Sequence, residues 1–190
     1  MISDPGQTQN IATEHPEIVK NLRSDYESWW ESISTDFADY CEIIIDTEKE
    51  DPVCLHSHDW HTKNTPPWNQ NQVRAGLVDN GFWIIDVARK GTYEFTLRRW
   101  PVESGLAMKN TAPPGDPIPG GKPYPDGKGI HFVTAKIRIG NETIEQQINN
   151  EEMDVRFTFE LEPGEKRLQT WLKDRAGVER GAYYVYVTKK

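Results

Sequence analysis

The chain has 190 residues, a formal net charge of −8 and 11% aromatic residues. This length suits one domain or one domain with a small appendage, and the aromatic side chains supply enough apolar area for a core, which excludes a wholly disordered chain. Neither an apolar run of about 20 residues, nor a signal peptide, nor a basic stripe is present, so we expect neither a membrane nor nucleic acid as partner, and no compartment is predicted.

The acidity is concentrated in the N-terminal part of the chain. Residues 1–51 contain 13 acidic and 3 basic residues, whereas residues 52–190 contain 17 acidic and 19 basic residues. Together with the change in hydrophobic pattern described below, this asymmetry predicts two parts. Residues 1–36 would form an acidic segment with a helix, and residues 37–190 would form a second domain.

An amphipathic helix is predicted from about residue 15. His15-Pro16-Glu17 is typical of a helix start, because proline is tolerated in the first turn and glutamate is favourable near the positive end of the helix dipole. Apolar residues then recur at spacings of three and four, at Ile18, Val19, Leu22, Tyr26, Trp29, Trp30 and Ile33. A lone helix cannot cover two adjacent tryptophans. We therefore expect it to dock on the rest of the chain, on a partner, or on a second copy through Trp29 and Trp30.

After Thr35 the hydrophobic pattern has a period of two residues, which predicts strands. The candidate strands are Cys41–Asp46, Val53–His56, Phe82–Ala88, Tyr93–Arg99, Phe132–Ile139, Val155–Leu161, Leu168–Leu172 and Ala182–Val187. Gly140-Asn141 predicts a two-residue hairpin turn, and Pro163-Gly164 and Lys90-Gly91 predict further returns. Short strands without intervening helices indicate a mainly β fold, an antiparallel β-sandwich of jelly-roll type preceded by one helix.

One segment fits neither a helix nor a strand. Residues 111–128 are rich in proline and glycine, and proline lacks the N–H donor that a sheet interior needs. We interpret this segment as a long surface loop, either flexible or folded over the sandwich.

Histidine and cysteine offer few candidates for metal or redox chemistry. His56, His58 and His61 have a spacing that could surround zinc, but no matching carboxylate motif accompanies them, so we favour hydrogen-bonded histidines at a strand end and expect no metal. Cys41 and Cys54 could form one disulfide in an exported protein. Buried free thiols are the favoured interpretation, because Cys41 adjoins an isoleucine run.

Aromatic and polar residues gather in His58-Asp59-Trp60-His61 and in Pro67-Trp68-Asn69-Gln70. Aromatic faces beside acid and amide groups suit sugar rings, which stack through their C–H face and hydrogen bond through hydroxyls. Arg98-Arg99-Trp100-Pro101 adds a guanidinium for an anionic group or a cation–π contact. The candidate ligand-binding residues are Asp59, Trp60, Trp68, Asn69, Arg99 and Trp100. The same composition also suits a loop that folds back onto the sandwich.

Several stretches together resemble the C-terminal region of bacterial arylsulfatases, of the alkaline-phosphatase-like sulfatase family. Residues 4–12 resemble the segment that precedes the late helix of that family, and His15 to Trp30 resembles the helix itself. Its β-rich extension resembles His58-Asp59-Trp60, Pro67-Trp68-Asn69-Gln70, Asn80-Gly81-Phe82-Trp83, Tyr93 to Pro101 and Gly181 to Val187. The resemblance covers nearly the whole chain.

The resemblance implies a module without the catalytic machinery. The family's C/S-x-P-x-R motif, whose Cys or Ser becomes formylglycine beside Ca²⁺, matches neither Cys41 nor Cys54, so no catalytic residue, metal or cofactor is assigned to this chain. Formylglycine and Ca²⁺ would belong to a catalytic domain elsewhere. The G-x-S-x-G, Walker and G-x-G-x-x-G motifs are also missing from the sequence.

Two functions follow as hypotheses. The first is a noncatalytic sulfatase module that packs against a sulfatase catalytic domain, the parent activity being sulfuric ester hydrolysis, often in the periplasm or outside the cell. The alternative is a carbohydrate-binding β-sandwich for a sulfated or neutral glycan.

Overall fold

The computed structural model describes residues 4–47, 49–149 and 151–190. It divides into two compact units, residues 1–41 and residues 42–190. The predicted boundary followed residue 36.

The first unit is helical. It consists of η1 (Ala12–Glu14), α1 (Pro16–Ser34) and η2 (Thr35–Ala38). As predicted, α1 has its proline in the first turn, where the missing N–H would have no helical partner. The rings of Tyr26, Trp29 and Trp30 contact one another, with centroids 5.7–6.5 Å apart. No helix among the described residues is both long and apolar enough to cross a membrane.

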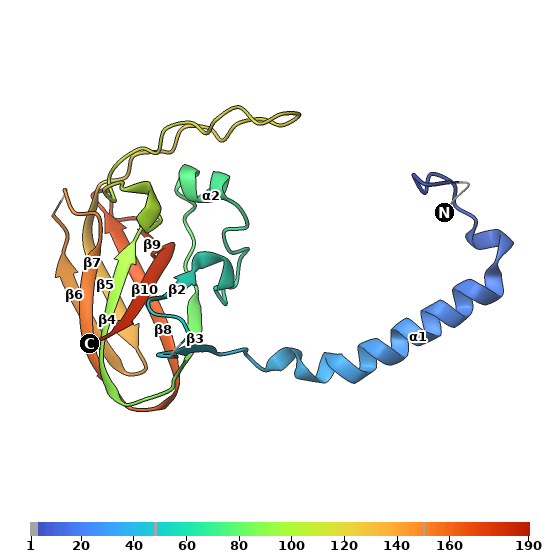
Figure 1. Cartoon of the computed structure of the whole chain (residues 1–190), viewed down its shortest axis with the longest axis horizontal. Coiled ribbons are helices and arrows are strands. Elements are labelled where there is room, and N and C mark those ends of the chain that lie inside the picture. The colour runs from blue at the N-terminus through green and yellow to red at the C-terminus, as the bar shows by residue number, and fades with distance from the viewer. Residues whose placement is uncertain (1–3, 48, 150) are drawn as a thin grey trace. The chain divides into compact units, whose positions relative to one another are not determined.

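The second unit is mainly β, as the sequence pattern predicted. Its strands are β1 (Ile43–Ile45), β2 (Val53–His56), β3 (Phe82–Val87), β4 (Gly91–Arg98), β5 (Phe132–Ile139), β6 (Glu142–Gln147), β7 (Val155–Leu161), β8 (Gly164–Asp174), β9 (Glu179–Arg180) and β10 (Tyr184–Lys189). Its helical turns are η3 (Ser57–Asp59), α2 (Gln70–Ala75) and η4 (Val102–Ser104). Figure 1 shows the strands in two layers, with α2 beside them.

The strands form two sheets. One sheet has the order β1-β3-β8-β5-β6, with β9 paired to β8, and the other has the order β2-β10-β4-β7. Strand pairs in both sheets are antiparallel except β1 and β3, which pair in parallel. The antiparallel sandwich is therefore confirmed, with one parallel pair at the end of the six-stranded sheet.

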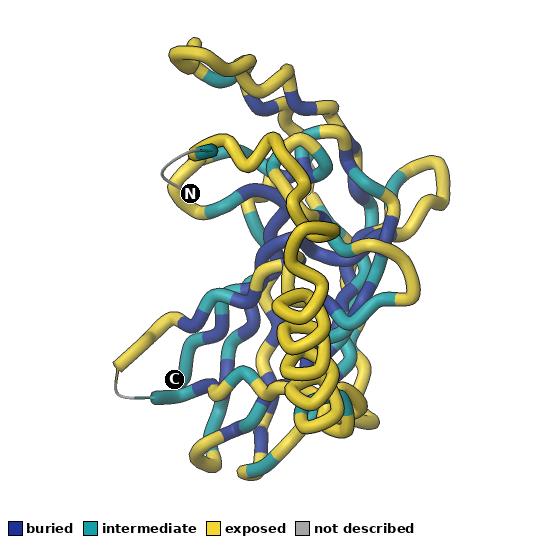
Figure 2. The backbone as a smooth tube through the Cα atoms, turned by 90° about the vertical axis from the view of Figure 1, so that its right-hand side faces the viewer, coloured by how far each residue is buried: buried dark blue, intermediate teal, exposed yellow. Residues whose placement is uncertain are grey.

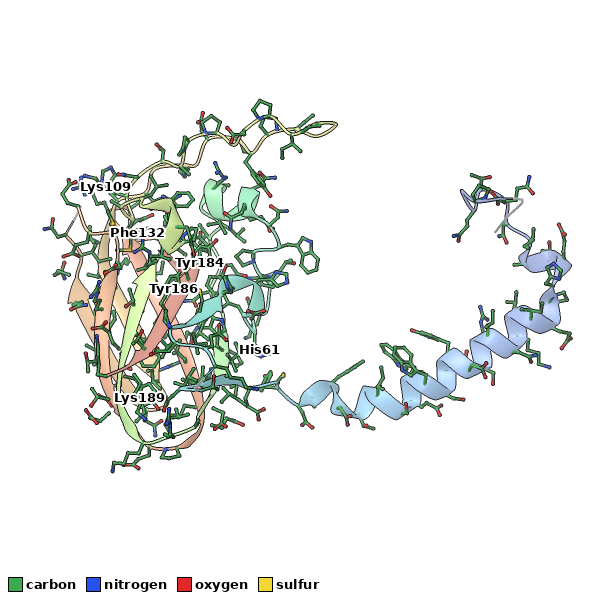
Figure 3. All side chains as sticks on the ribbon, viewed as in Figure 1. His61, Lys109, Phe132, Tyr184, Tyr186 and Lys189 are labelled. Carbon is green, nitrogen blue, oxygen red and sulfur yellow. The ribbon has the colours of Figure 1, made fainter. Side chains whose placement is uncertain are left out.

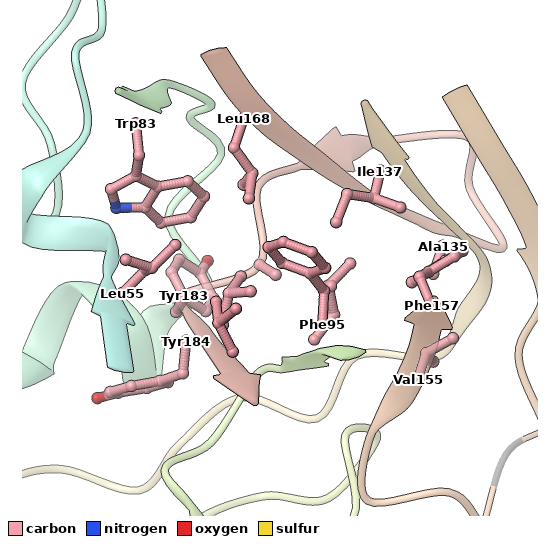
Figure 4. Close-up of a cluster of buried hydrophobic side chains, with 14 of the residues drawn as sticks. Leu55, Trp83, Phe95, Ala135, Ile137, Val155, Phe157, Leu168, Tyr183 and Tyr184 are labelled. Carbon is pink, nitrogen blue, oxygen red and sulfur yellow. The ribbon is translucent and has the colours of Figure 1, made fainter. Parts of the chain in front are cut away.

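The core lies between the two sheets. Side chains alternate strictly along β7, where Phe157, Phe159 and Leu161 are buried and the residues between them are exposed. Phe95 on β4 meets Phe159 edge to face, with ring centroids 5.8 Å apart. Figure 4 shows residues of the other sheet, among them Trp83, facing this layer across the interior. Burial of these aromatic and aliphatic side chains is the main stabilising contribution to the unit.

The connections between strands match one prediction and depart from two others. Gly140-Asn141 forms the expected turn between β5 and β6, and Gly140 has φ +56°. Lys90-Gly91 does not close a hairpin, because β3 and β4 belong to different sheets and the connection crosses between them. The absence of intervening helices was a wrong prediction, since α2 lies between β2 and β3.

The proline-rich segment is an ordered pair of arms, which we call the ribbon (residues 109–130). Backbone hydrogen bonds join its arms at three levels: Ile130 N to Lys109 O, Gly127 N to Ala112 O, and Gly115 N to Tyr124 O. It extends beyond the strand ends on the side of α2, and its tip is exposed (Figures 1 and 2). The N–H groups of Gly115, Gly127 and Ile130 thus supply hydrogen bonds between the arms that the prolines of the ribbon cannot donate.

Candidate functional site

A surface hollow of about 520 Å³ lies beside α2. Four parts of the chain line it: residues 56–59 at the end of β2 and in η3, residues 67–70 and Val73 around the start of α2, Tyr124 from the ribbon, and Tyr184 from β10. Figure 3 shows Tyr184 where β10 approaches α2. This volume lies within the range of small-ligand sites, roughly 300–1,000 Å³.

Trp68 is held at the rim of the hollow by the cap of α2. Asn69 is the N-cap residue; its Oδ1 accepts from Asn71 N at 3.0 Å, while its own N–H donates to Gln72 Oε1 at 3.1 Å. The Trp68 N–H donates to the same Gln72 oxygen. The backbone of Trp68 is therefore fixed while the residue remains 70% exposed.

His58 packs beside Trp68. The two rings have centroids 4.8 Å apart and planes tilted by 47°. His58 Nδ1 also lies 3.4 Å from the carbonyl oxygen of Pro67, the residue before Trp68. These contacts restrict the indole orientation, so that one side of the hollow carries an oriented aromatic surface.

On the inner side of the hollow, the polar side chains of Gln70 and Tyr184 form a hydrogen bond with each other. Gln70 Nε2 donates to the hydroxyl of Tyr184 at 2.5 Å, and the His56 ring meets the Tyr184 ring edge to face at 5.6 Å. Tyr184 is buried, and this burial raises the pKa of its hydroxyl above the usual value of 10.0. Tyr184 therefore stays protonated, and its hydroxyl both accepts from Gln70 and retains a proton to donate.

Tyr124 brings the ribbon into the site, and Arg74 on α2 holds it there. Arg74 Nη1 donates to the carbonyl oxygens of Pro113 at 2.7 Å and Pro125 at 2.9 Å, one on each arm of the ribbon. The Arg74 guanidinium also lies 5.4 Å from the Tyr124 ring centroid. One side chain thus clamps both arms beside the helix that carries the cap.

The candidate residues predicted from sequence separate into two groups. Asp59, Trp68 and Asn69 all line the hollow. Trp60, Arg99 and Trp100 do not line it, and they are 4%, 0% and 2% exposed respectively. A buried ring or guanidinium cannot offer its face to a sugar, so these three residues are reassigned to the interior.

Close packing explains the burial of Trp60. Its ring contacts those of Trp83 and Tyr183, with centroids 5.8 and 6.1 Å away. Gly81 and Gly181 approach it from two other segments, and a Cβ on either glycine would lie only 2.4 Å from a Trp60 atom. Trp60 is therefore a core residue that requires glycine on both sides.

Arg99 and Trp100 serve the base of the ribbon. Arg99 Nη2 donates to Lys128 O, Trp100 Nε1 donates to Asn110 O at 3.1 Å, and the guanidinium lies 4.3 Å from the Trp100 ring centroid. Burial lowers the pKa of Arg99 to about 10. The predicted anion site at Arg99 has no surface access, because Arg99 is fully buried and its two terminal nitrogens donate to backbone carbonyls of the ribbon.

The histidine and cysteine predictions have different outcomes. His56 and His58 line the hollow, whereas His61 pairs with Phe82 on β3. The described residues contain no group of three or more His, Cys, Asp or Glu side chains arranged for a metal ion.

Both cysteines are free; Cys41 is exposed rather than buried, because it lies outside the sandwich core. Cys54 is half-buried, and burial raises its pKa to about 11.

Sequence reasoning included Gln70 in the aromatic and polar segment but not among the candidate ligand-binding residues, and it missed Tyr124 and Tyr184 altogether. One local signal was available: Asn69 followed by Gln72 is the pattern of a capping box, and Gly76, with φ +71°, ends α2. Tyr124 and Tyr184 reach the hollow only through tertiary structure, and no local pattern marks them.

Fold and site together define a β-sandwich module with an aromatic, polar surface hollow. No family model and no curated protein matches the chain. Similar solved structures include a ruminal GH26 endo-beta-1,4-mannanase, with TM-score 0.41 and 10% identity over 76% of this chain and 27% of that chain. Another is a CBM35 from Cellvibrio japonicus Abf62, with TM-score 0.34 and 14% identity over 73% of this chain and 82% of that chain. This chain spans about a quarter of the mannanase chain. At these identities neither likeness identifies a ligand.

Proposed function

We propose that residues 42–190 form a carbohydrate-binding module whose ligand occupies the hollow beside α2. The observation that carries the proposal is Trp68, which is 70% exposed although the cap of α2 and His58 hold it in one orientation. A fixed, exposed indole is suited to stacking against the apolar C–H face of a sugar ring.

The polar groups around Trp68 complement sugar hydroxyls. Asp59 supplies acceptors, Asn69 and Gln70 supply amide groups, and the Tyr184 hydroxyl lies on the inner side. Few polar groups around an aromatic surface are the usual composition of a small-ligand site. The stacking surface would provide affinity, and the polar groups would fix the orientation of the ring.

Binding accounts for this site better than hydrolysis. Glycoside hydrolysis ordinarily uses two carboxylates on opposite sides of the scissile bond. Among the described residues that line the hollow, Asp59 is the only carboxylate. One carboxylate can accept hydrogen bonds from a bound sugar, but it has no acid or base partner here.

Affinity electrophoresis of the full chain in gels with different soluble polysaccharides tests the proposal. We expect retardation by at least one polysaccharide, and loss of that retardation in Trp68→Ala with an unchanged melting temperature. Trp29→Ala is the matched control, since Trp29 is 54% exposed but lies in the first unit. Retardation that persists in Trp68→Ala, or that is absent with every polysaccharide, would contradict the proposal.

We also propose, from the resemblance to arylsulfatases, that the chain acts as a noncatalytic scaffold for a sulfatase catalytic domain. The apolar face of α1, with Leu22, Trp29 and Trp30 each 44–64% exposed, favours this role because such a face needs a packing partner. We expect the purified chain to release no sulfate from 4-nitrocatechol sulfate in the presence of Ca²⁺. Turnover that survives repurification would refute the noncatalytic role.

A further inference from the structure

With histidine counted as neutral, the described residues that line the hollow carry one formal charge, and it is negative. Among the described lining residues there is a single carboxylate, Asp59, and no lysine or arginine. Asp59 is exposed, and no hydrogen bond or ion pair within the described part of the chain involves its carboxylate. An approaching ligand therefore meets an uncompensated negative charge.

Arg74, a cation on α2, is engaged with the ribbon. Arg74 packs on Tyr124, but it is not a lining residue, and its Nη1 donates to Pro113 O and Pro125 O. Turning this guanidinium toward a ligand would leave two ribbon carbonyls without their donor. Arg74 thus holds the ribbon and is not positioned to compensate the charge of Asp59.

Resting on the proposed function, we propose that the site selects uncharged sugars over sulfated ones and that Asp59 determines this specificity. A carboxylate accepts strong, charge-assisted hydrogen bonds from sugar hydroxyls. A sulfate ester at the same place offers only acceptor oxygens and a negative charge, so a hydrogen bond is replaced by repulsion. Two like charges about 4 Å apart in water change an affinity by about fivefold.

Matched pairs of polysaccharides test this inference. The full chain is titrated with a neutral polymer and its sulfated form on the same backbone, such as dextran and dextran sulfate, mannan and sulfated mannan, or agarose and a carrageenan. We expect the neutral member to bind at least about fivefold more tightly, with a preference that decreases as salt is added. Equal or tighter binding of the sulfated member overturns this inference but leaves carbohydrate binding intact. If neither the neutral nor the sulfated member of any pair binds, the proposed function is overturned as well.

A variant pair separates Asp59 from the overall negative charge of the chain. Asp59→Asn keeps the shape of the side chain and should narrow the preference for the neutral polymer by about fivefold. Glu165→Gln removes the same charge from an exposed position on β8 and should leave the preference unchanged. If Asp59→Asn leaves the preference for the neutral polymer unaltered, Asp59 does not set the specificity. The same conclusion follows if Glu165→Gln narrows that preference by as much as Asp59→Asn does.

Discussion

The side-chain amide of Gln70 donates a 2.5 Å hydrogen bond to the hydroxyl of Tyr184, which joins the first turn of α2 to β10 across 114 positions of sequence. Because Asn69 caps the same helix and follows Trp68 directly, this bond connects the aromatic rim of the hollow to the sandwich. The position of Trp68 therefore depends on a contact deep in the site.

Replacing Tyr184 by Phe should loosen this connection. The variant removes the acceptor of Gln70 while keeping the ring, so we expect a loss of about 1 kcal/mol in the free energy of unfolding, measured in urea. Ligand affinity should decrease by severalfold as the start of α2 becomes less restricted. Tyr26→Phe, an exposed tyrosine of α1, serves as the control. Unchanged stability and affinity would show that the Gln70–Tyr184 bond does not support the site.

Gly181→Ala tests whether Trp60 is structural. The new Cβ would lie 2.4 Å from Cζ2 and 2.7 Å from Cη2 of a buried indole, so we expect a destabilisation of about 1–3 kcal/mol. Thermal unfolding followed by circular dichroism measures this loss. Gly129→Ala is the control, since the nearest atom to its new Cβ is 3.4 Å away. If Gly181→Ala is as stable as the control, the assignment of Trp60 to the core is incorrect.

Arg74→Ala should release the ribbon from α2. Without the two hydrogen bonds to Pro113 O and Pro125 O, backbone amides of both arms should exchange hydrogen faster, and ligand affinity should decrease because Tyr124 is less fixed. Hydrogen–deuterium exchange with mass spectrometry detects the change. Arg175→Ala, an exposed arginine between β8 and β9, should leave exchange in the ribbon unchanged. Unaltered exchange in Arg74→Ala would contradict the clamp.

Asp46 should make the sandwich sensitive to acid. Its carboxylate accepts from Arg89 at 2.7 and 2.9 Å, from Lys189 at 2.7 Å and from the Tyr93 hydroxyl at 3.1 Å. The Arg89 hydrogen bonds contribute most to a pKa well below the usual 3.8. Because the pKa is lower in the folded state, the stabilisation is fully present above pH 3.8 and is lost as the pH falls toward the folded-state pKa.

Asp46→Asn tests this dependence. The residue has φ +67°, which asparagine tolerates, so the substitution removes the charge with little change in backbone strain. At pH 7 we expect the free energy of unfolding, measured in urea, to decrease by about 1–3 kcal/mol. This is less than for a fully buried ion pair, because the Arg89 side chain is largely exposed. The difference from wild type should shrink below pH 3.8. A difference that stays constant with pH would contradict an ionic role, and Glu165→Gln is the control.

Local patterns predicted much of the secondary structure. The recurrence of apolar residues at three and four positions specified α1, and the alternation in Val155–Leu161 specified β7, because each pattern lies within a single element. β6 was missed since none of its residues is buried, so no alternation marks it. The sequence pattern also did not show which sheet each strand joins. Lys90-Gly91 has the composition of a hairpin turn, yet it connects strands of different sheets.

The candidate site, too, could be predicted from the sequence only in part. The sequence by itself determined that aromatic and polar residues gather between positions 58 and 70, and that a sandwich follows an acidic helix. Only the tertiary structure decided that Trp60 is 4% exposed and Trp68 is 70% exposed. Two glycines distant in sequence enclose the first indole, whereas the cap of α2 turns the second toward solvent. Composition and periodicity are local properties, but burial depends on segments that meet only after folding.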